Sequence, residues 1–235
     1  MPHHFGVLIP STNTTVEIEF TQLLPESLQF HVARLGKAGY TPFSTSLDTD
    51  IAYQAKMLGN AKVEVVSLIQ TSASLFESGY DDRIKSVIRE GAGLPAITSA
   101  EAISDAISAL GIKRIALVSP YSDEVIGRAQ TYFEANAGLT VVAMEGFGAT
   151  DAYAIGTIGE SHALQAFTRV NTPEVEALVV PGGNFPTMRC IATWEAQFGK
   201  PIITTNQVVL WSVMRAMGVK KPMPGLGRLL AESSV

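Results

Sequence analysis

Short runs of apolar and β-branched residues alternate along the chain with longer stretches in which apolar positions follow a helical period. Most of the short runs are apolar at every position, which is typical of strands buried on both faces of a parallel sheet. The longer stretches predict helices, among them residues 82–91, 100–111 and 122–138. This alternation predicts a wound α/β fold. Its expected strands cover residues 6–10, 30–35, 63–69, 95–98, 114–120, 139–144, 175–181 and 201–205.

The chain also shows an internal repeat. Three segments of the first half have counterparts, in the same order, in the second half, although any parallel α/β chain resembles itself weakly. We predict two tandem pseudo-symmetric parallel-sheet α/β halves, residues 1–111 and 112–218, with residues 219–235 as a tail packing back on the body. The matched segments are residues 63–70 with 175–182, 93–99 with 199–205, and 6–12 with 115–122.

Polar and glycine-rich segments follow four of the predicted strands. Two such halves place the carboxyl ends of their strands across a crevice, where sheets of this class bind ligands. Hydroxyl and amide side chains at helix starts can hold an anion, and paired glycines let backbone N–H groups approach a ligand. The alternatives are ordinary helix caps and a plain turn. The candidate binding residues are Ser11, Asn13, Thr71, Ser72, Tyr121, Gly182, Gly183 and Asn184.

Charge and composition narrow the class of protein. The formal net charge is −5 and no cluster of Lys and Arg stands out, so the sequence excludes a nucleic-acid partner. No apolar run reaches the ~18–20 residues of a membrane span, and the N-terminus lacks the pattern of a signal peptide. Cys190 is the single cysteine, which excludes an internal disulfide and fits a cytoplasmic location. The His and Cys spacing predicts no metal site.

These loops, together with residues 204–207 and 224–230, resemble the aspartate/glutamate racemase superfamily, and within it the arylmalonate decarboxylase and maleate cis-trans isomerase branch. The resemblance spans nearly the whole chain. It implies an enzyme without metal or cofactor that binds a small carboxylic acid and forms an enolate-like intermediate. It also adds Asn206 to the candidate binding residues.

The sequence departs from this family at its catalytic thiols. The cysteine positions of the family match Gln70 and Gly182 here, and neither side chain can carry a proton or attack an alkene. The candidates for moving the proton are Tyr121, a bound water and Lys37, where the family has an aliphatic residue; Lys37 can equally be a solvated loop lysine. Cys190 fits a small hydrophobic residue inside a helix.

Two functions remain open at this point. The first is a cofactor-independent isomerase or lyase that acts next to the carboxylate of a small acid without a thiol. The second is a non-catalytic carboxylate binder that has lost the cysteines of the family. An enzyme should hold a titratable group with a strongly shifted pKa in the crevice, whereas a binder needs only donors. The substrate is left open, as is a homo-oligomer.

Overall fold

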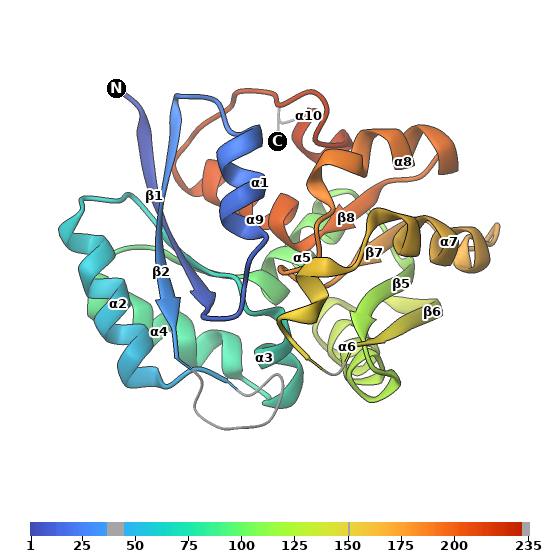
Figure 1. Cartoon of the computed structure of the whole chain (residues 1–235), viewed down its shortest axis with the longest axis horizontal. Coiled ribbons are helices and arrows are strands. Elements are labelled where there is room, and N and C mark those ends of the chain that lie inside the picture. Colours follow the sequence, from blue (N-terminus) through green and yellow to red (C-terminus); the bar gives the residue numbers. More distant parts are fainter. Residues whose placement is uncertain (37–44, 150, 232–235) are drawn as a thin grey trace.

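A computed structural model describes residues 1–36, 45–149 and 151–231 of the chain. It contains two four-stranded parallel sheets with the same topology, ordered β2-β1-β3-β4 and β6-β5-β7-β8 (Figure 1). The predicted fold class is confirmed, and all eight expected strands are present. They are β1 (His3–Pro10), β2 (Leu28–Leu35), β3 (Val66–Leu68), β4 (Ala96–Thr98), β5 (Arg114–Tyr121), β6 (Thr140–Ala149), β7 (Ala177–Val180) and β8 (Ile202–Thr204).

Helices connect the strands in both halves. Three of them, α4, α5 and α6, cover the amphipathic stretches that the pattern predicts as helical. The α-helices are α1 (Val16–Leu23), α2 (Asp48–Asn60), α3 (Thr71–Phe76), α4 (Tyr80–Ala92), α5 (Ser99–Ala109), α6 (Asp123–Ala137), α7 (Glu160–Val170), α8 (Ile191–Phe198), α9 (Thr205–Ala216) and α10 (Arg228–Ala231). Two 3₁₀ turns, η1 (Ala154–Thr157) and η2 (Met188–Cys190), complete the second half.

The strand register confirms the internal repeat. Val66 of β3 pairs with Ala96 of β4, and Leu178 of β7 pairs with Ile202 of β8. These are the same positions that the gapless sequence matches make equivalent. The two segments therefore occupy the same place in two separate sheets, which is the arrangement a duplication requires.

The first strand shows why its sequence is apolar at every position. Phe5, Val7 and Ile9 are fully buried in the large core that also contains the second half. Leu8, on the other face, is buried in a second core beneath α2 and α4. Gly6 permits this packing, because a Cβ there would lie 2.9 Å from the side chain of Leu58 in α2. Both faces of the strand are covered, as in other parallel sheets.

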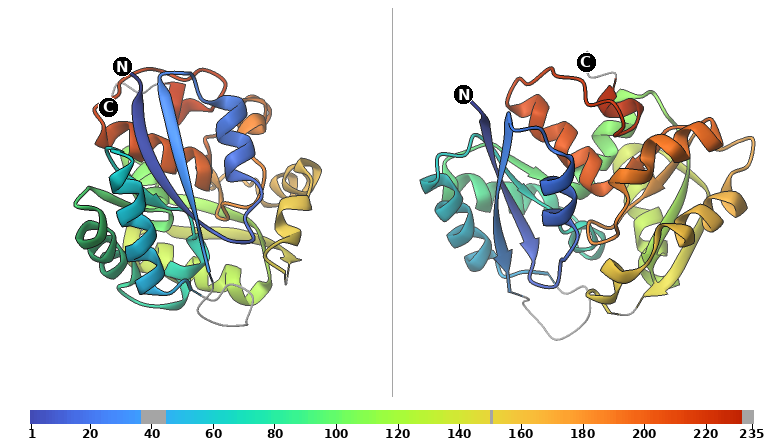
Figure 2. Two further views of the ribbon diagram at one scale, coloured as in Figure 1. Left: turned by 60° about the vertical axis from the view of Figure 1, so that its left-hand side comes forward. Right: turned by 45° about the horizontal axis from the view of Figure 1, so that its top comes forward.

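The two halves pack against each other through α5 and α9, which lie side by side in the middle of the molecule (Figure 1). The further views show the N-terminus at the end of the molecule opposite the arrowheads of β1 and β2 (Figure 2). The C-terminal segment lies on the body: Leu229 and Leu230 are buried, and Gln207 of α9 donates a 2.8 Å hydrogen bond to the carbonyl of Leu226. None of the described helices is both long and apolar enough to cross a bilayer.

Candidate functional site

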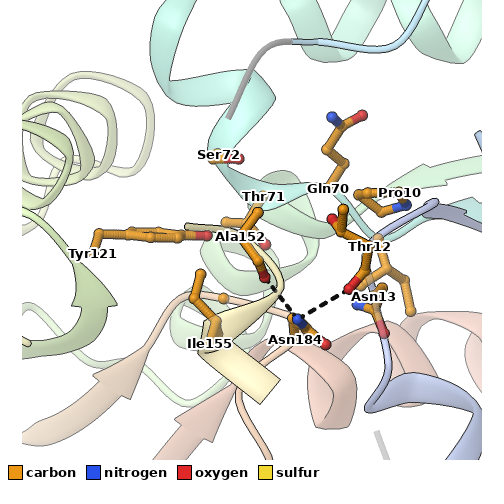
Figure 3. A pocket seen from close by; sticks show the side chains of 13 residues that line it. Pro10, Thr12, Asn13, Gln70, Thr71, Ser72, Tyr121, Ala152, Ile155 and Asn184 are labelled. Carbon is orange, nitrogen blue, oxygen red and sulfur yellow. Dashed lines mark hydrogen bonds between the residues drawn. The ribbon is translucent and has the colours of Figure 1, made fainter. Parts of the chain in front are cut away.

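A pocket opens where the carboxyl ends of the strands of both halves meet (Figure 3). It encloses about 50 Å³, room for a few water-sized groups at the ~10–15 Å³ that each needs. Seven of the nine candidate binding residues from the sequence line it, and Ser11 and Asn206 do not. The complete lining is Pro10, Thr12, Asn13, Ile69, Gln70, Thr71, Ser72, Tyr121, Ala152, Ile155, Gly182, Gly183 and Asn184.

Hydroxyl groups form one wall of the pocket. Thr71 and Ser72 open α3 directly after β3, so the segment that the sequence presents as a loop is the first turn of a helix. The hydroxyl of Thr71 lies 2.9 Å from that of Ser99 and 3.3 Å from that of Thr205. All three side chains are buried. A polar cluster therefore supports this wall from behind.

Tyr121 is the last residue of β5 and reaches across the pocket toward Ser72 (Figure 3). Burial raises the pKa of Tyr121 well above its ordinary value of 10, and a hydrogen bond with Ser72 opposes that shift only in part. The phenol therefore stays protonated at neutral pH. Within the described part of the chain, Tyr121 is the titratable side chain in the pocket lining.

The second half contributes two adjacent glycines. Gly182 has a φ of +133°, a conformation that other residues rarely adopt, and a Cβ on it would lie 3.6 Å from the Tyr121 hydroxyl. A Cβ on Gly183 would lie 2.4 Å from Ile69. The N–H of Gly182 donates to the hydroxyl of Thr205 at 2.8 Å, so this N–H already has a protein partner.

Asn13 caps α1. Its Oδ1 accepts hydrogen bonds from the N–H groups of Thr15 and Val16 at 3.0 and 3.1 Å. Its side-chain oxygen has the structural role that the sequence left as an alternative. Asn13 also lines the pocket.

Asn184 joins segments of both halves at the pocket rim. Its Oδ1 accepts the N–H of Thr14 at 2.7 Å, and its Nδ2 donates to the carbonyls of Ala152 at 2.8 Å and Thr12 at 3.4 Å (Figure 3). The bonds to Thr12 and Thr14 cross from the second half to the first. Asn184 therefore holds the rim together.

The remaining candidates lie around the pocket. Ser11 is exposed, and its carbonyl accepts a 3.1 Å hydrogen bond from Arg34. Asn206 is only 1% exposed and lies behind the pocket, where its amide donates to the Gly183 carbonyl at 3.0 Å. Gln70 lines the pocket and accepts a 3.2 Å hydrogen bond from Ser46. Lys37 lies outside the described residues.

Glu19 is a buried carboxylate that the sequence analysis missed. It is 2% exposed and accepts hydrogen bonds from the N–H groups of Thr187 and Met188, at 2.7 and 2.8 Å, and from the amide of Asn206, at 2.7 Å. Burial raises its pKa above 4.5, while the three hydrogen bonds oppose the shift. The sequence holds one signal that Glu19 is buried, because Glu19 shares a helix face with the apolar residues Val16 and Phe20. Glu19 thus joins α1 to the second half, next to the glycine loop.

Cys190 lies outside the pocket lining, at the end of η2 and directly before α8. The sequence analysis expected it inside the helix. Its Sγ donates to Glu160 at 2.7 Å. Burial and the neighbouring carboxylate raise the pKa of this thiol to about 12, so very little thiolate forms at neutral pH.

We predict that Cys190→Ser retains the binding and any turnover of the wild type within about twofold, because the thiol is outside the pocket and protonated. Titration with a thiol reagent should label the native protein slowly and the unfolded protein at once. Rapid labelling accompanied by loss of activity would contradict this assignment and place the thiol in the chemistry.

Comparison with known proteins identifies the family. The family model described as arylmalonate decarboxylase matches residues 5–230. The arylmalonate decarboxylase of Bordetella bronchiseptica is 27% identical over 233 residues, covering 97% of this chain and 96% of that protein. The maleate isomerase of Nocardia farcinica is 26% identical over 241 residues, with 97% and 96% coverage.

Solved structures agree with the sequence matches. A Cys-to-Ser variant of the Nocardia farcinica maleate cis-trans isomerase, with a covalently bound succinylcysteine intermediate, superposes with a TM-score of 0.90 at 25% identity, covering 99% of both chains. A liganded variant of arylmalonate decarboxylase gives 0.84 at 25% identity, covering 99% of this chain and 100% of that one. From its sequence and its duplicated fold, this chain belongs to the arylmalonate decarboxylase family.

Proposed function

We propose that this protein is a cofactor-independent isomerase or lyase that acts next to the carboxylate of a small carboxylic acid, without a thiol. One observation carries the proposal: hydroxyl and amide donors from both halves line a single pocket at the strand ends. Relatives of this chain are named arylmalonate decarboxylase and maleate isomerase. The small volume of the pocket favours a small acid.

The chemistry at the pocket begins with anion binding. Thr71 and Ser72 present hydroxyls at the first turn of α3, where backbone N–H groups and the helix dipole favour negative charge. Apolar side chains of Ile69 and Ile155 border the same space. Hydrogen bonds to charged oxygen are stronger in such surroundings than in water.

Tyr121 acts in this proposal as a donor to oxygen. Its raised pKa keeps the phenol protonated at neutral pH, which suits a hydrogen bond to the oxygen of an enolate-like intermediate. The same shift argues against Tyr121 as a base, because its phenolate is disfavoured by burial. In this proposal, either Lys37 or a bound water transfers the proton to or from the carbon next to the carboxylate. Turnover by Lys37→Met distinguishes the two, because it is lost if Lys37 carries the proton and kept if water does.

The proton carrier differs from that of the thiol-dependent relatives. The Nocardia farcinica structure contains a succinylcysteine, so a thiol reacts in that protein. In this chain the single cysteine lies outside the pocket lining, and Gln70 and Gly182 occupy the positions that the resemblance assigns to thiols. The protein should therefore neither racemise aspartate nor isomerise maleate measurably.

The test is turnover of phenylmalonate, methylmalonate, maleate and aspartate in D₂O, followed by NMR. Decarboxylation or deuterium incorporation next to a carboxylate, lost in Tyr121→Phe and kept in Cys190→Ser, supports the proposal. Calorimetry on the same acids separates the alternative, since a carboxylate binder shows heat of binding without exchange. If the protein neither binds nor turns over any of the four acids, both functions are contradicted.

A further inference from the structure

A chain of three buried hydroxyls lies behind the pocket wall. Thr71 is in its centre, 2.9 Å from the hydroxyl of Ser99 and 3.3 Å from that of Thr205. Thr205 is also the acceptor for the N–H of Gly182, at 2.8 Å. Of the three hydroxyl residues, as the described structure places them, Thr71 alone lines the pocket.

The two outer hydroxyls are symmetric partners. Ser99 is the first residue of α5 and Thr205 the first residue of α9, and the repeat makes these positions equivalent. The equivalent of Thr71 in the second half is Gly183, which has no hydroxyl. Both helix starts therefore direct a hydroxyl at one central oxygen, and the pseudo-two-fold symmetry is broken at that point.

Counting protons shows what this arrangement requires. Three hydroxyls carry three protons, but they make two hydroxyl–hydroxyl contacts, so one proton has no acceptor among them. An oxygen with two lone pairs can accept from both neighbours. Thr205, already an acceptor for Gly182, has Thr71 as its neighbour for donation.

We propose, on the basis of the proposed function, that Ser99 and Thr205 are positioning residues that both donate to the Thr71 hydroxyl and so aim its proton into the pocket. The spare proton then belongs to Thr71, the member that faces the pocket. With an acid bound, an oxygen of its carboxylate accepts this proton, and every proton of the chain is paired. The cluster therefore favours a ligand atom that accepts hydrogen bonds and cannot donate them. A carboxylate oxygen is such an atom.

The opposite direction makes a different prediction. If Thr71 donated to Ser99, then Ser99 would compete with the bound acid for the Thr71 proton. Removing the Ser99 hydroxyl would then strengthen binding, whereas in our proposal it weakens binding. The sign of the change in affinity therefore decides which atom is the donor.

The experiment measures the affinity of phenylmalonate, methylmalonate, maleate and aspartate by calorimetry for wild type, Ser99→Ala, Thr71→Val and the double variant. We expect Ser99→Ala to lower the affinity for the acid that binds wild type by about threefold to tenfold, which corresponds to one neutral hydrogen bond. The double variant should bind no more weakly than Thr71→Val, because Ser99 acts through Thr71. Ser99→Thr keeps a hydroxyl and should restore most of the affinity.

Thr98→Val is the matched control. Thr98 precedes Ser99 and is buried, and its hydroxyl has no hydrogen-bond partner among the described residues. The Thr98→Val variant should therefore bind the acid as tightly as wild type. Tighter binding by Ser99→Ala would overturn this proposal but not the proposed function. The same holds if the losses of affinity in the two single variants simply add in the double variant. A wild type that binds none of the four acids overturns the proposed function, and this proposal falls with it.

Discussion

Glu19→Ala should lower the free energy of unfolding by roughly 3–5 kcal/mol. The substitution removes an acceptor shared by the N–H groups of Thr187 and Met188 and by the amide of Asn206. An unsatisfied buried donor costs about 1–3 kcal/mol, and here three are left in one place. The loss falls at the contact between α1 and the second half, so the two halves should separate more easily.

Glu17→Ala is the matched control for this prediction. Glu17 lies on the same helix, but its side chain is partly exposed and pairs with Arg34 at the surface. Surface ion pairs contribute about 0–1 kcal/mol, so its removal should change stability little. Urea unfolding followed by circular dichroism measures both variants. Equal losses in the two would show that Glu19 does not hold the halves together.

Thr71→Val should weaken binding of a carboxylic acid by about tenfold to a hundredfold, the value of a hydrogen bond to a charged group. Valine has the shape of threonine but no hydroxyl, so the pocket keeps its volume. The variant should also unfold more easily, by about 1–3 kcal/mol, because the buried hydroxyls of Ser99 and Thr205 lose their common partner.

Calorimetry with the acid that binds wild type best gives the affinity, and thermal unfolding gives the stability. Thr98→Val separates the loss of a working hydroxyl from the exchange of any buried threonine for valine. If Thr71→Val bound every acid as tightly as wild type, Thr71 would have to be removed from the binding site.

The fold could be predicted because its determinants are local or repeated. Strands such as β1 and β7 are apolar at each buried position, and α4 and α6 show a clear helical period. The duplication could be inferred from three matched segments in the same order. The segment after β3 was harder, because Thr71 and Ser72 at a strand end suit a loop as well as the first turn of α3.

The candidate site could be predicted in part. Parallel strands end at one edge, so residues such as Ser72, Tyr121 and Gly183 had to gather near the crevice. Which of their groups face the space was not readable from the sequence. The Asn13 oxygen accepts N–H groups at the start of α1, a role that the sequence left only as an alternative. The N–H of Gly182 donates to Thr205, a partner that sequence position does not reveal.

By itself, the sequence determined the α/β class, the two halves, the edge at which a pocket forms and the absence of cysteines at the thiol positions of the family. Only the tertiary structure decided which polar groups meet there. Thr71 and Thr205 are 134 residues apart, and Glu19 and Asn206 are 187 apart. Periodicity reports the face on which a side chain lies. Its partner across the interface depends on how the two halves pack, to within the ångström that a hydrogen bond requires.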